Sequence, residues 1–254
     1  MREKRVIIVG ATSGLGRGLA ERYIAAGCTV GVAGRNAVAL KELTAIDPER
    51  VKSEVIDITA EDAPRRLSEL ISSTGGMDLY IHCSGILKEE KELDISGQTD
   101  IVATNVTGFV RMLSAVYRYY RDDKEKRKQK PAIAAISSIA GIRGLGDLPA
   151  YSASKAFDST YLEALRQKAD KEGVKVTITD IKPGWTRTAL LNSNRRYILE
   201  MDSAVVVNKI YDAINNRKPL SVIGIRWKIL TAIERSLPRG IWRKLHIPLW
   251  RDNQ

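Results

Sequence analysis

The sequence has few residues of the kinds that build disulfide frameworks and metal centres. Its 254 residues include only two cysteines, Cys28 and Cys83, and two histidines. Neither cysteine belongs to a Cys-x-x-Cys or Cys/His cluster, so a disulfide scaffold is excluded and no metal site is expected. Both cysteines are predicted to be small, buried thiols.

Long apolar runs are also missing. The run at residues 6–9 is too short for the core of a signal peptide and ends at a glycine turn. No stretch approaches the ~20 apolar residues that a membrane-spanning helix requires. With 44% hydrophobic and 28% charged residues, the composition is that of a soluble globular protein, which we expect to reside in a reducing cytoplasm.

Short apolar runs alternate with longer amphipathic segments along most of the chain. Short runs without internal alternation suit strands that are buried on both faces of a parallel sheet. Seven such strands with helical crossovers predict an α/β fold. We expect one Rossmann-type, doubly wound domain over residues 1–225 and a helical C-terminal extension over residues 226–254. The predicted strands cover residues 5–9, 29–33, 52–56, 79–83, 132–137, 175–181 and 220–223.

A glycine-rich turn follows the first predicted strand and precedes a helix that extends to about residue 26. Glycines in such a turn let the backbone approach a pyrophosphate, which then lies at the helix N-terminus, where free N–H groups favour anions. This placement predicts a dinucleotide site. The residues of the turn that we expect to contact the dinucleotide are Gly10, Thr12, Ser13, Gly14, Leu15 and Gly16.

The end of the second predicted strand indicates which dinucleotide is bound. NAD needs a carboxylate there for its adenosine ribose, whereas the 2′-phosphate of NADP needs a cation. Gly34 and Arg35 supply a guanidinium and no carboxylate, which favours NADP(H) over NAD(H). After the third strand, Asp57 and Ile58 are placed to contact the adenine. Alternatively, Asp57 caps a helix that begins near Thr59.

Tyr151 and Lys155 form a potential acid–base pair. They are four residues apart and therefore share one face of a helix, where an ammonium group lowers the pKa of a phenol. Asn105 lies within a long predicted helix over residues 98–120, where it matters only if it faces the site. His82, at the end of the fourth strand, is interpreted as a hydrogen-bonded structural residue.

These motifs together resemble those of the short-chain dehydrogenase/reductase family. The glycine-rich turn, Asn105, Ser138 and the Tyr151/Lys155 pair follow one another in the family's order between about residue 5 and about residue 223. Ser138 has the family's spacing of thirteen residues before Tyr151. Ser137 is the competing serine, but its spacing is one residue too long.

The resemblance implies a role for each catalytic candidate. Tyr151 is the general acid in ketone reduction and the general base in alcohol oxidation. Lys155 binds the nicotinamide ribose and lowers the pKa of Tyr151. Ser138 hydrogen-bonds the substrate oxygen, and Asn105 holds a water that restores the proton. A positioned donor suits this chemistry, because hydride delivery to a carbonyl carbon builds negative charge on the oxygen.

The segment after the sixth predicted strand resembles the family's Pro-Gly-x-Val-x-Thr motif, with Thr186 in place of the valine. By this resemblance Thr188 binds the nicotinamide carboxamide, and residues from 189 to about 203 form a lid over the substrate. The remaining residues that it assigns to the cofactor site here are Pro183, Gly184 and Thr186.

The sequence departs from the family pattern at two places. Where the family has Asn-Asn-Ala-Gly after the fourth strand, this chain has His82-Cys83-Ser84-Gly85. Only Gly85 is retained, and we keep it as an expected cofactor contact. The second departure is the extension of about thirty residues beyond the last predicted strand.

The C-terminal extension concentrates basic and aromatic residues. Residues 226–251 hold seven basic residues against Glu234, a net charge of +6 within the chain's +11, and three of the four tryptophans. Leu230, Ile233 and Leu237 share one helical face, and Pro238 interrupts the pattern. Such a segment can lie in a membrane interface, pack on a second subunit or cover the pocket mouth. Nucleic acid is not expected, because no binding motif accompanies the charge.

The motifs predict an NADP(H)-dependent oxidoreductase that transfers a hydride between the nicotinamide and a carbonyl or secondary alcohol of a hydrophobic substrate. Steroid-, retinoid- and 3-oxoacyl-like compounds are all compatible. The alternative is a non-catalytic NADP(H)-binding sensor or a peripheral membrane or regulatory protein, which the changed segment at residues 82–85 and the basic extension motivate. By the family pattern, the helices near residues 98–120 and 150–171 pair across a two-fold axis in a homodimer or homotetramer.

Overall fold

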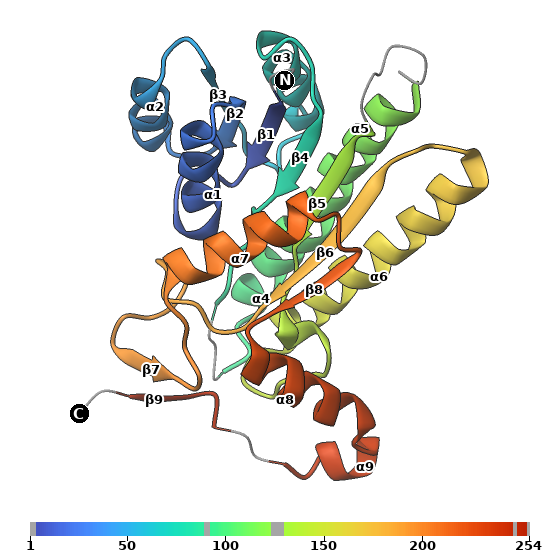
Figure 1. The fold of residues 1–254 in the computed structure, drawn as a ribbon. Coiled ribbons are helices and arrows are strands. Elements are labelled where there is room, and N and C mark those ends of the chain that lie inside the picture. Colours follow the sequence, from blue (N-terminus) through green and yellow to red (C-terminus); the bar gives the residue numbers. More distant parts are fainter. Residues whose placement is uncertain (1–3, 89–91, 123–129, 246–247, 253–254) are drawn as a thin grey trace.

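A seven-stranded parallel sheet forms the centre of the computed structural model, which describes residues 4–88, 92–122, 130–245 and 248–252 (Figure 1). The strands lie in the order β3-β2-β1-β4-β5-β6-β8. All seven predicted strands are confirmed, and their ends lie within two residues of the prediction. Their bounds are β1 Arg5–Val9, β2 Thr29–Gly34, β3 Val51–Val55, β4 Leu79–His82, β5 Ala132–Ile136, β6 Thr177–Pro183 and β8 Leu220–Ile223.

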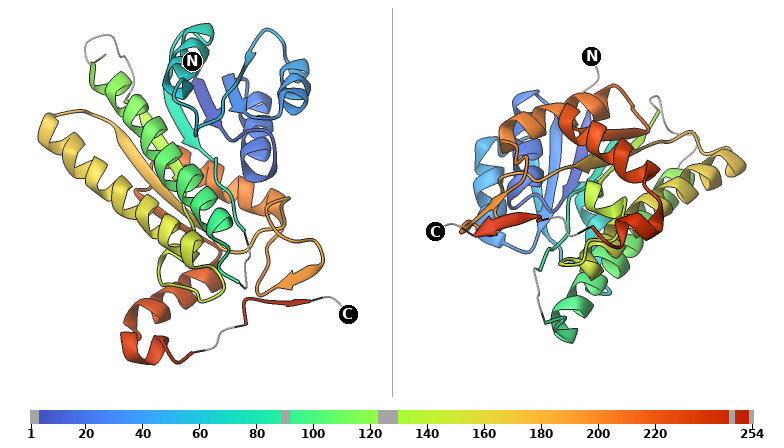
Figure 2. Two further views of the ribbon diagram at one scale, coloured as in Figure 1. Left: turned by 180° about the vertical axis from the view of Figure 1, so that it is seen from behind. Right: turned by 90° about the horizontal axis from the view of Figure 1, so that it is seen from below.

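Helices cover both faces of the sheet, which explains why the inner strands are buried on both sides. Alternate side chains of β1 point to opposite faces: Ile7 and Val9 join one core cluster, Val6 and Ile8 the other, and all four are fully buried. Figure 2 shows the two helical layers from further sides. One layer consists of α1 (Gly14–Ala25), α2 (Ala37–Ile46) and α7 (Ser203–Asn215), and the other of α3 (Ala63–Ser73), α5 (Phe109–Asp122) and α6 (Pro149–Glu172).

The predicted long helix over residues 98–120 is present, but its middle is wound differently. It begins as α4 (Ile95–Ile101), continues as the π-helical segment η1 (Val102–Gly108) and ends as α5. Asn105 lies at the centre of η1 and is buried. π-Helical turns are rare and occur frequently at functional sites.

The helix expected near Thr59 begins later. Asp57 accepts hydrogen bonds from the Thr59 backbone N–H (2.9 Å) and hydroxyl (2.7 Å), which forms a local turn. α3 then begins at Ala63, after Asp62. Asp57 therefore shapes the turn after β3 and does not cap a helix.

The C-terminal extension folds back below the carboxyl ends of the strands (Figure 1). α8 (Ile225–Ser236) ends before Pro238, as predicted, and the short α9 (Arg239–Trp242) follows. The final strand, β9 (Trp250–Asp252), pairs antiparallel with β7 (Arg195–Tyr197). The last described residues of the chain are thus joined to the segment that was predicted to be a lid.

Candidate active site

A cleft of about 380 Å³ lies at the carboxyl ends of the central strands. β1 is flanked by β2 and β4, so the chain changes direction across the sheet at this point, which is where open α/β sheets form ligand sites. With one exception, Asn105, the cleft is lined by every residue that we predicted to form the site. These residues are Gly10, Thr12, Ser13, Gly14, Leu15, Gly16, Arg35, Asp57, Ile58, Gly85, Ser138, Tyr151, Lys155, Pro183, Gly184, Thr186 and Thr188.

The glycine-rich turn brings backbone to backbone at one end of the cleft. Gly10 has a positive φ of 86°, and a Cβ there would lie 2.5 Å from the Ser84 nitrogen. A Cβ at Gly16 would lie 2.0 Å from the Gly10 oxygen. α1 begins immediately after Ser13, whose side chain makes no capping hydrogen bond. The first N–H groups of α1 therefore have no side-chain acceptor at Ser13 and are suited to an anion.

Arg35 is exposed and lines the cleft just beyond β2. Among the described residues its guanidinium makes no hydrogen bond or ion pair, whereas the nearby Arg17 is held by Glu21 and Glu42. Burial acts to raise the pKa of Asp57, but hydrogen bonds from Thr59 and the charge of Arg35 outweigh it, and the net pKa is lowered. This end of the cleft combines an available cation with a turn suited to an anion.

Tyr151, Ser138 and Lys155 line the same cleft and are each less than 10% exposed. The Lys155 nitrogen lies 6.0 Å from the centre of the Tyr151 ring. The Ser138 oxygen accepts a hydrogen bond from the Ala140 N–H (3.1 Å), which leaves its hydroxyl proton to donate. Ser137, in contrast, donates to Asp180 and to the Ile181 carbonyl behind the cleft.

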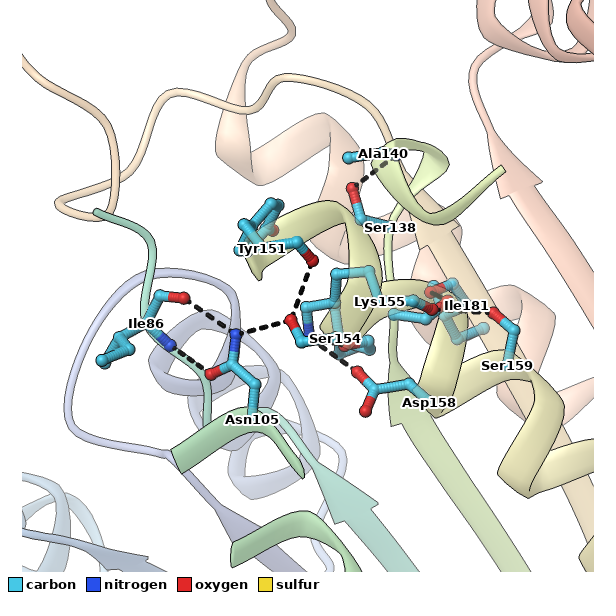
Figure 3. Close-up of polar contacts among 12 residues, drawn as sticks. Ile86, Asn105, Ser138, Ala140, Tyr151, Ser154, Lys155, Asp158, Ser159 and Ile181 are labelled. Carbon is cyan, nitrogen blue, oxygen red and sulfur yellow. Dashed lines mark hydrogen bonds and ion pairs between the residues drawn. The ribbon is translucent and has the colours of Figure 1, made fainter. Parts of the chain in front are cut away.

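Lys155 is held in place by a carboxylate that we did not predict. Its ammonium donates to Asp158 Oδ2 (2.9 Å), as Figure 3 shows, and to the Ile136 carbonyl (3.0 Å). Asp158 is only 1% exposed. Burial acts to lower the pKa of Lys155, but the charges of Asp158 and Tyr151 outweigh it, and the net pKa is raised. The only signal in the sequence was the spacing of three residues on one helix.

Asn105 lies behind the cleft and holds the loop that follows β4. Its Oδ1 accepts from the Ile86 N–H (2.8 Å), and its Nδ2 donates to the Ile86 carbonyl (2.9 Å) and to Ser154 Oγ (3.1 Å) (Figure 3). A Cβ at Gly85 would lie 3.4 Å from Asn105 Oδ1 and 3.5 Å from Lys155 Nζ. Asn105 thus keeps Gly85 close against Lys155.

Residues 82–85, which depart from the family's Asn-Asn-Ala-Gly pattern, begin with a buried histidine. His82 is 1% exposed, and its Nδ1 shares a hydrogen bond with the Tyr80 hydroxyl (3.0 Å). Burial, followed by the charge of Lys155, lowers the pKa of His82 to about 3, so the imidazole is neutral. Cys28 is buried as expected, but Cys83 is half-buried and lines the cleft. Burial raises the pKa of the Cys83 thiol to about 12.

The segment after β6 joins the two ends of the cleft. A Cβ at Gly14 would lie 3.3 Å from Thr188 Cβ, so Thr188 lies beside the N-terminus of α1. A Cβ at Gly184 would lie 2.1 Å from the Trp227 Nε1, so only glycine lets α8 pack this closely on the end of β6. Trp227 also donates to the Leu199 carbonyl (3.3 Å). β6, the predicted lid and α8 therefore meet at one indole ring.

The C-terminal extension covers the mouth of the cleft, which was one of the three alternatives left open by its sequence. Trp227 and Leu249 are buried in the same apolar cluster as Tyr151. The apolar face of the extension was compatible with this packing, but its sequence did not select it over a membrane interface or a second subunit. Among the described residues, no helix has both the length and the apolar composition needed to cross a bilayer. The residues of the extension that line the cleft are Trp227, Leu230, Ile233, Glu234, Leu237, Trp242, Leu245 and Leu249.

Comparisons with known proteins agree with this geometry. The short chain dehydrogenase family model matches residues 4–198. An uncharacterized oxidoreductase of Myxococcus xanthus (strain DK1622) is 35% identical over 217 residues, which cover 81% of this chain and 82% of that protein. Dehydrogenase/reductase SDR family member 7B of Bos taurus is 31% identical over 202 residues, 75% of this chain and 60% of that protein.

A solved structure of similar fold is a short chain dehydrogenase from Burkholderia cenocepacia J2315 in complex with NADP. It has a TM-score of 0.81, covers 97% of this chain and 98% of its own, and is 20% identical. The fold and the cleft at its switch point define a Rossmann-type α/β protein. With the family match over most of its length, the chain belongs to the short-chain dehydrogenases and is an oxidoreductase acting on CH–OH or carbonyl groups.

Proposed function

We propose that the protein is an NADP(H)-dependent reductase of a hydrophobic carbonyl compound. The observation that carries this proposal is one continuous cleft with two chemically different ends. One end has the glycine-rich turn and Arg35, which pairs with none of the described residues, and the other has Tyr151, Ser138 and Lys155 under an apolar wall. A polyanionic dinucleotide suits the first end, and an apolar substrate suits the second.

The cofactor end fits NADP in shape and in charge. The backbone approaches closely at Gly10 and Gly16, where no side chain is present, and the N-terminus of α1 would hold the pyrophosphate. Arg35 would hold the 2′-phosphate, and Asp57 with Ile58 the adenine. The remaining contacts would come from Gly85 and Lys155 and from the segment after β6 with Pro183, Gly184, Thr186 and Thr188.

The polar residues at the other end would handle the proton. NADPH, when bound, supplies a hydride to the carbonyl carbon. The Tyr151 hydroxyl donates its proton to the substrate oxygen, and Ser138 donates a hydrogen bond to the same oxygen. Lys155, kept charged by Asp158, favours the phenolate that Tyr151 becomes.

Asn105 would act in this mechanism through the loop that it holds. Both hydrogens of its amide group are used by Ile86 and Ser154, and its oxygen accepts from the Ile86 N–H. One acceptor site on that oxygen remains for the water that the family pattern assigns to it. We propose that Asn105 positions Gly85 and Ile86 beside Lys155 and in this way supports the return of the proton to Tyr151.

Replacing Tyr151 by Phe tests the chemistry. We expect Tyr151→Phe to lower kcat for NADPH-dependent reduction by about 10²-fold or more, because the proton donor is lost, while NADPH still binds. The measurement is NADPH absorbance with a panel of steroid-like, retinoid-like and 3-oxoacyl-like ketones, with NADPH binding followed by fluorescence. If Tyr151→Phe still turns over a ketone at the rate of the unchanged protein, the proposed mechanism is wrong. If the unchanged protein binds NADPH but reduces no ketone, the alternative of a non-catalytic NADP(H)-binding sensor is favoured.

Replacing Arg35 by Ala tests the choice of cofactor. Loss of a guanidinium facing a phosphate should raise the Kd of NADPH by about 10-fold and leave that of NADH nearly unchanged. Arg17→Ala is the matched control, because Arg17 is already paired with Glu21 and Glu42. Equal losses of NADPH and NADH affinity in Arg35→Ala would contradict a 2′-phosphate contact.

We also propose a homodimer or homotetramer formed through the long helices α4, α5 and α6, as the family pattern implies. Val102 is 45% exposed where α4 passes into η1. An unpaired charge buried in an interface destabilises it. Val102→Glu should therefore lower the molar mass of the oligomer measured by light scattering. Val55→Glu, at an equally exposed position on β3, should leave the mass unchanged.

A further inference from the structure

α8 presents two apolar faces, and only one of them is needed to close the cleft. Trp227 and Thr231 are buried, and Leu230 packs against the cluster that contains Tyr151. On the opposite side, Ile225 and Ile229 are spaced four residues apart, are 67% and 57% exposed, and do not line the cleft. Packing among the described residues therefore does not explain the outer apolar face.

The exposed apolar face continues along the extension and is interleaved with positive charge. Ile233, Ile241 and Leu245 are each 46–50% exposed. Between residues 225 and 245 the only carboxylate belongs to Glu234, which is half-buried. The tail surface, as we call this region, consists of Ile225, Ile229, Ile233, Ile241 and Leu245 with the exposed basic residues Arg226, Lys228, Arg235, Arg239, Arg243 and Lys244.

The tail surface also borders the opening of the cleft. Ile233 and Leu245 line the cleft and are half-exposed, so they form part of its rim. Leu190 and Ile198 of the lid line the same cleft and are also exposed, at 44% and 36%. The rim is therefore apolar where it meets the tail surface.

α8 is fixed to the body of the protein, so its outer face has a defined orientation. Arg143 donates hydrogen bonds to the carbonyls of Glu234 (3.2 Å), Arg235 (3.2 Å) and Leu237 (2.8 Å) at the end of the helix. At the other end, Trp227 is packed against Gly184. A rigidly held amphipathic helix with basic flanks is suited to lie flat on a surface.

We infer that the tail surface docks on an anionic lipid bilayer, with the mouth of the cleft at the membrane. The exposed isoleucines enter the headgroup boundary, and the six basic side chains attract acidic headgroups. A second copy of this chain fits the same surface less well, because it would bring six further positive charges against it. The role of the docked cleft in taking an apolar substrate from the membrane rests on the proposed function, but the docking itself does not.

Vesicle binding by the full chain tests this inference. The probe is co-sedimentation with phosphatidylcholine vesicles that contain either no phosphatidylglycerol or about one third of it. The double variant Ile225→Ser/Ile229→Ser removes the apolar contact without touching the cleft. Its control is Val38→Ser/Ile46→Ser on α2, two positions that are equally exposed at 67% and 53%. Lys228→Glu/Arg239→Glu lowers the charge of the six basic side chains from +6 to +2.

We expect the unchanged protein and the control to sediment with the anionic vesicles but not with the neutral ones. The apolar and the charge variants should each bind the anionic vesicles at least ~10-fold more weakly. No binding by the unchanged protein, or equal binding by all variants, would overturn the inference. A lower mass of Ile225→Ser/Ile229→Ser in light scattering would overturn it in favour of a second copy.

Activity separates this inference from the proposed function. Neither Ile225 nor Ile229 lines the cleft, so turnover of a water-soluble ketone by Ile225→Ser/Ile229→Ser should equal that of the unchanged protein. Loss of vesicle binding with unchanged turnover supports the docking surface. If the protein binds vesicles but reduces no ketone, the docking surface is supported and the proposed reductase function is contradicted.

Discussion

At the scale of the residue, the charge of Lys155 depends on Asp158. A lysine that is 5% exposed loses hydration, which favours its neutral form. The Asp158 carboxylate, 2.9 Å away and itself buried, offsets that loss. The Tyr-x-x-x-Lys motif predicts a proton donor and its cation, while the counterion of that cation comes from the next turn of the same helix.

Removing the charge of Asp158 should change the pH dependence of the reaction. The charge of Asp158 and its hydrogen bond both act to raise the pKa of Lys155. In Asp158→Asn we therefore expect the alkaline limb of kcat/KM for reduction to move to lower pH by about one unit. Asp170→Asn, an exposed position on the same helix, is the control. A lower rate with an unmoved limb would mean that Asp158 only supports packing.

At the scale of the element, the predicted lid is tied to the end of the described chain. β7 and β9 form a two-stranded antiparallel sheet, and the Tyr197 and Trp250 rings meet edge to face with centres 6.0 Å apart. The Ile198 N–H donates to the Leu249 carbonyl (3.4 Å). A pair of three-residue strands is marginal in water, so its stability comes from the apolar cluster beneath it.

Truncating Leu249 should loosen the lid. Leu249 is 6% exposed and lines the cleft, and burial of a leucine of this kind contributes about 2–5 kcal/mol to packing. We expect Leu249→Ala to raise KM for the ketone by about 10-fold, to leave NADPH binding unchanged and to speed proteolysis within residues 187–202. Arg251→Ala, at the exposed position two residues later, should do none of these. Slow proteolysis and an unchanged KM would show that β9 does not hold the lid.

The contrast between the strands and these elements shows what local sequence can predict. The inner strands β1, β2, β4 and β5 could be predicted because an apolar run bounded by turns is itself the cause of a buried strand. The glycine-rich turn and the Tyr151/Lys155 pair could be predicted from the sequence because the spacing of their residues fixes their geometry. The π-helical turn at Asn105, the pairing of β7 with β9 and the contact between Gly184 and Trp227 had no local signal. Each of them depends on residues that meet only after the sheet has formed.

At the scale of the whole molecule, one buried histidine links stability to pH. His82 has a pKa of about 3 in the folded protein, mainly through burial, against an ordinary value of about 6.5 in the unfolded chain. Below about pH 6.5 the unfolded chain binds a proton that the folded protein cannot accept. The contribution of His82 to stability is therefore complete above that pH and is lost as the pH falls toward 3.

Replacing His82 should flatten this dependence. Between about pH 6.5 and about pH 5 the unchanged protein should lose roughly 2 kcal/mol more of its free energy of unfolding than His82→Asn does. Urea unfolding at a series of pH values measures the difference, and His246 is common to both proteins. Parallel curves for the two proteins would show that His82 is not held neutral by its surroundings.

The position of α8 in the chain determines the order in which the two ends of the cleft are synthesised. Synthesis runs from the amino end, and every residue at the glycine-turn end of the cleft precedes residue 225, whereas the wall over Tyr151 is completed by residues 227–249. The glycine-turn end of the cleft is therefore fully translated before the apolar wall over Tyr151. When β8 leaves the ribosome, the glycine-turn end of the cleft is complete, but the described residues that form the wall over Tyr151 have not yet emerged.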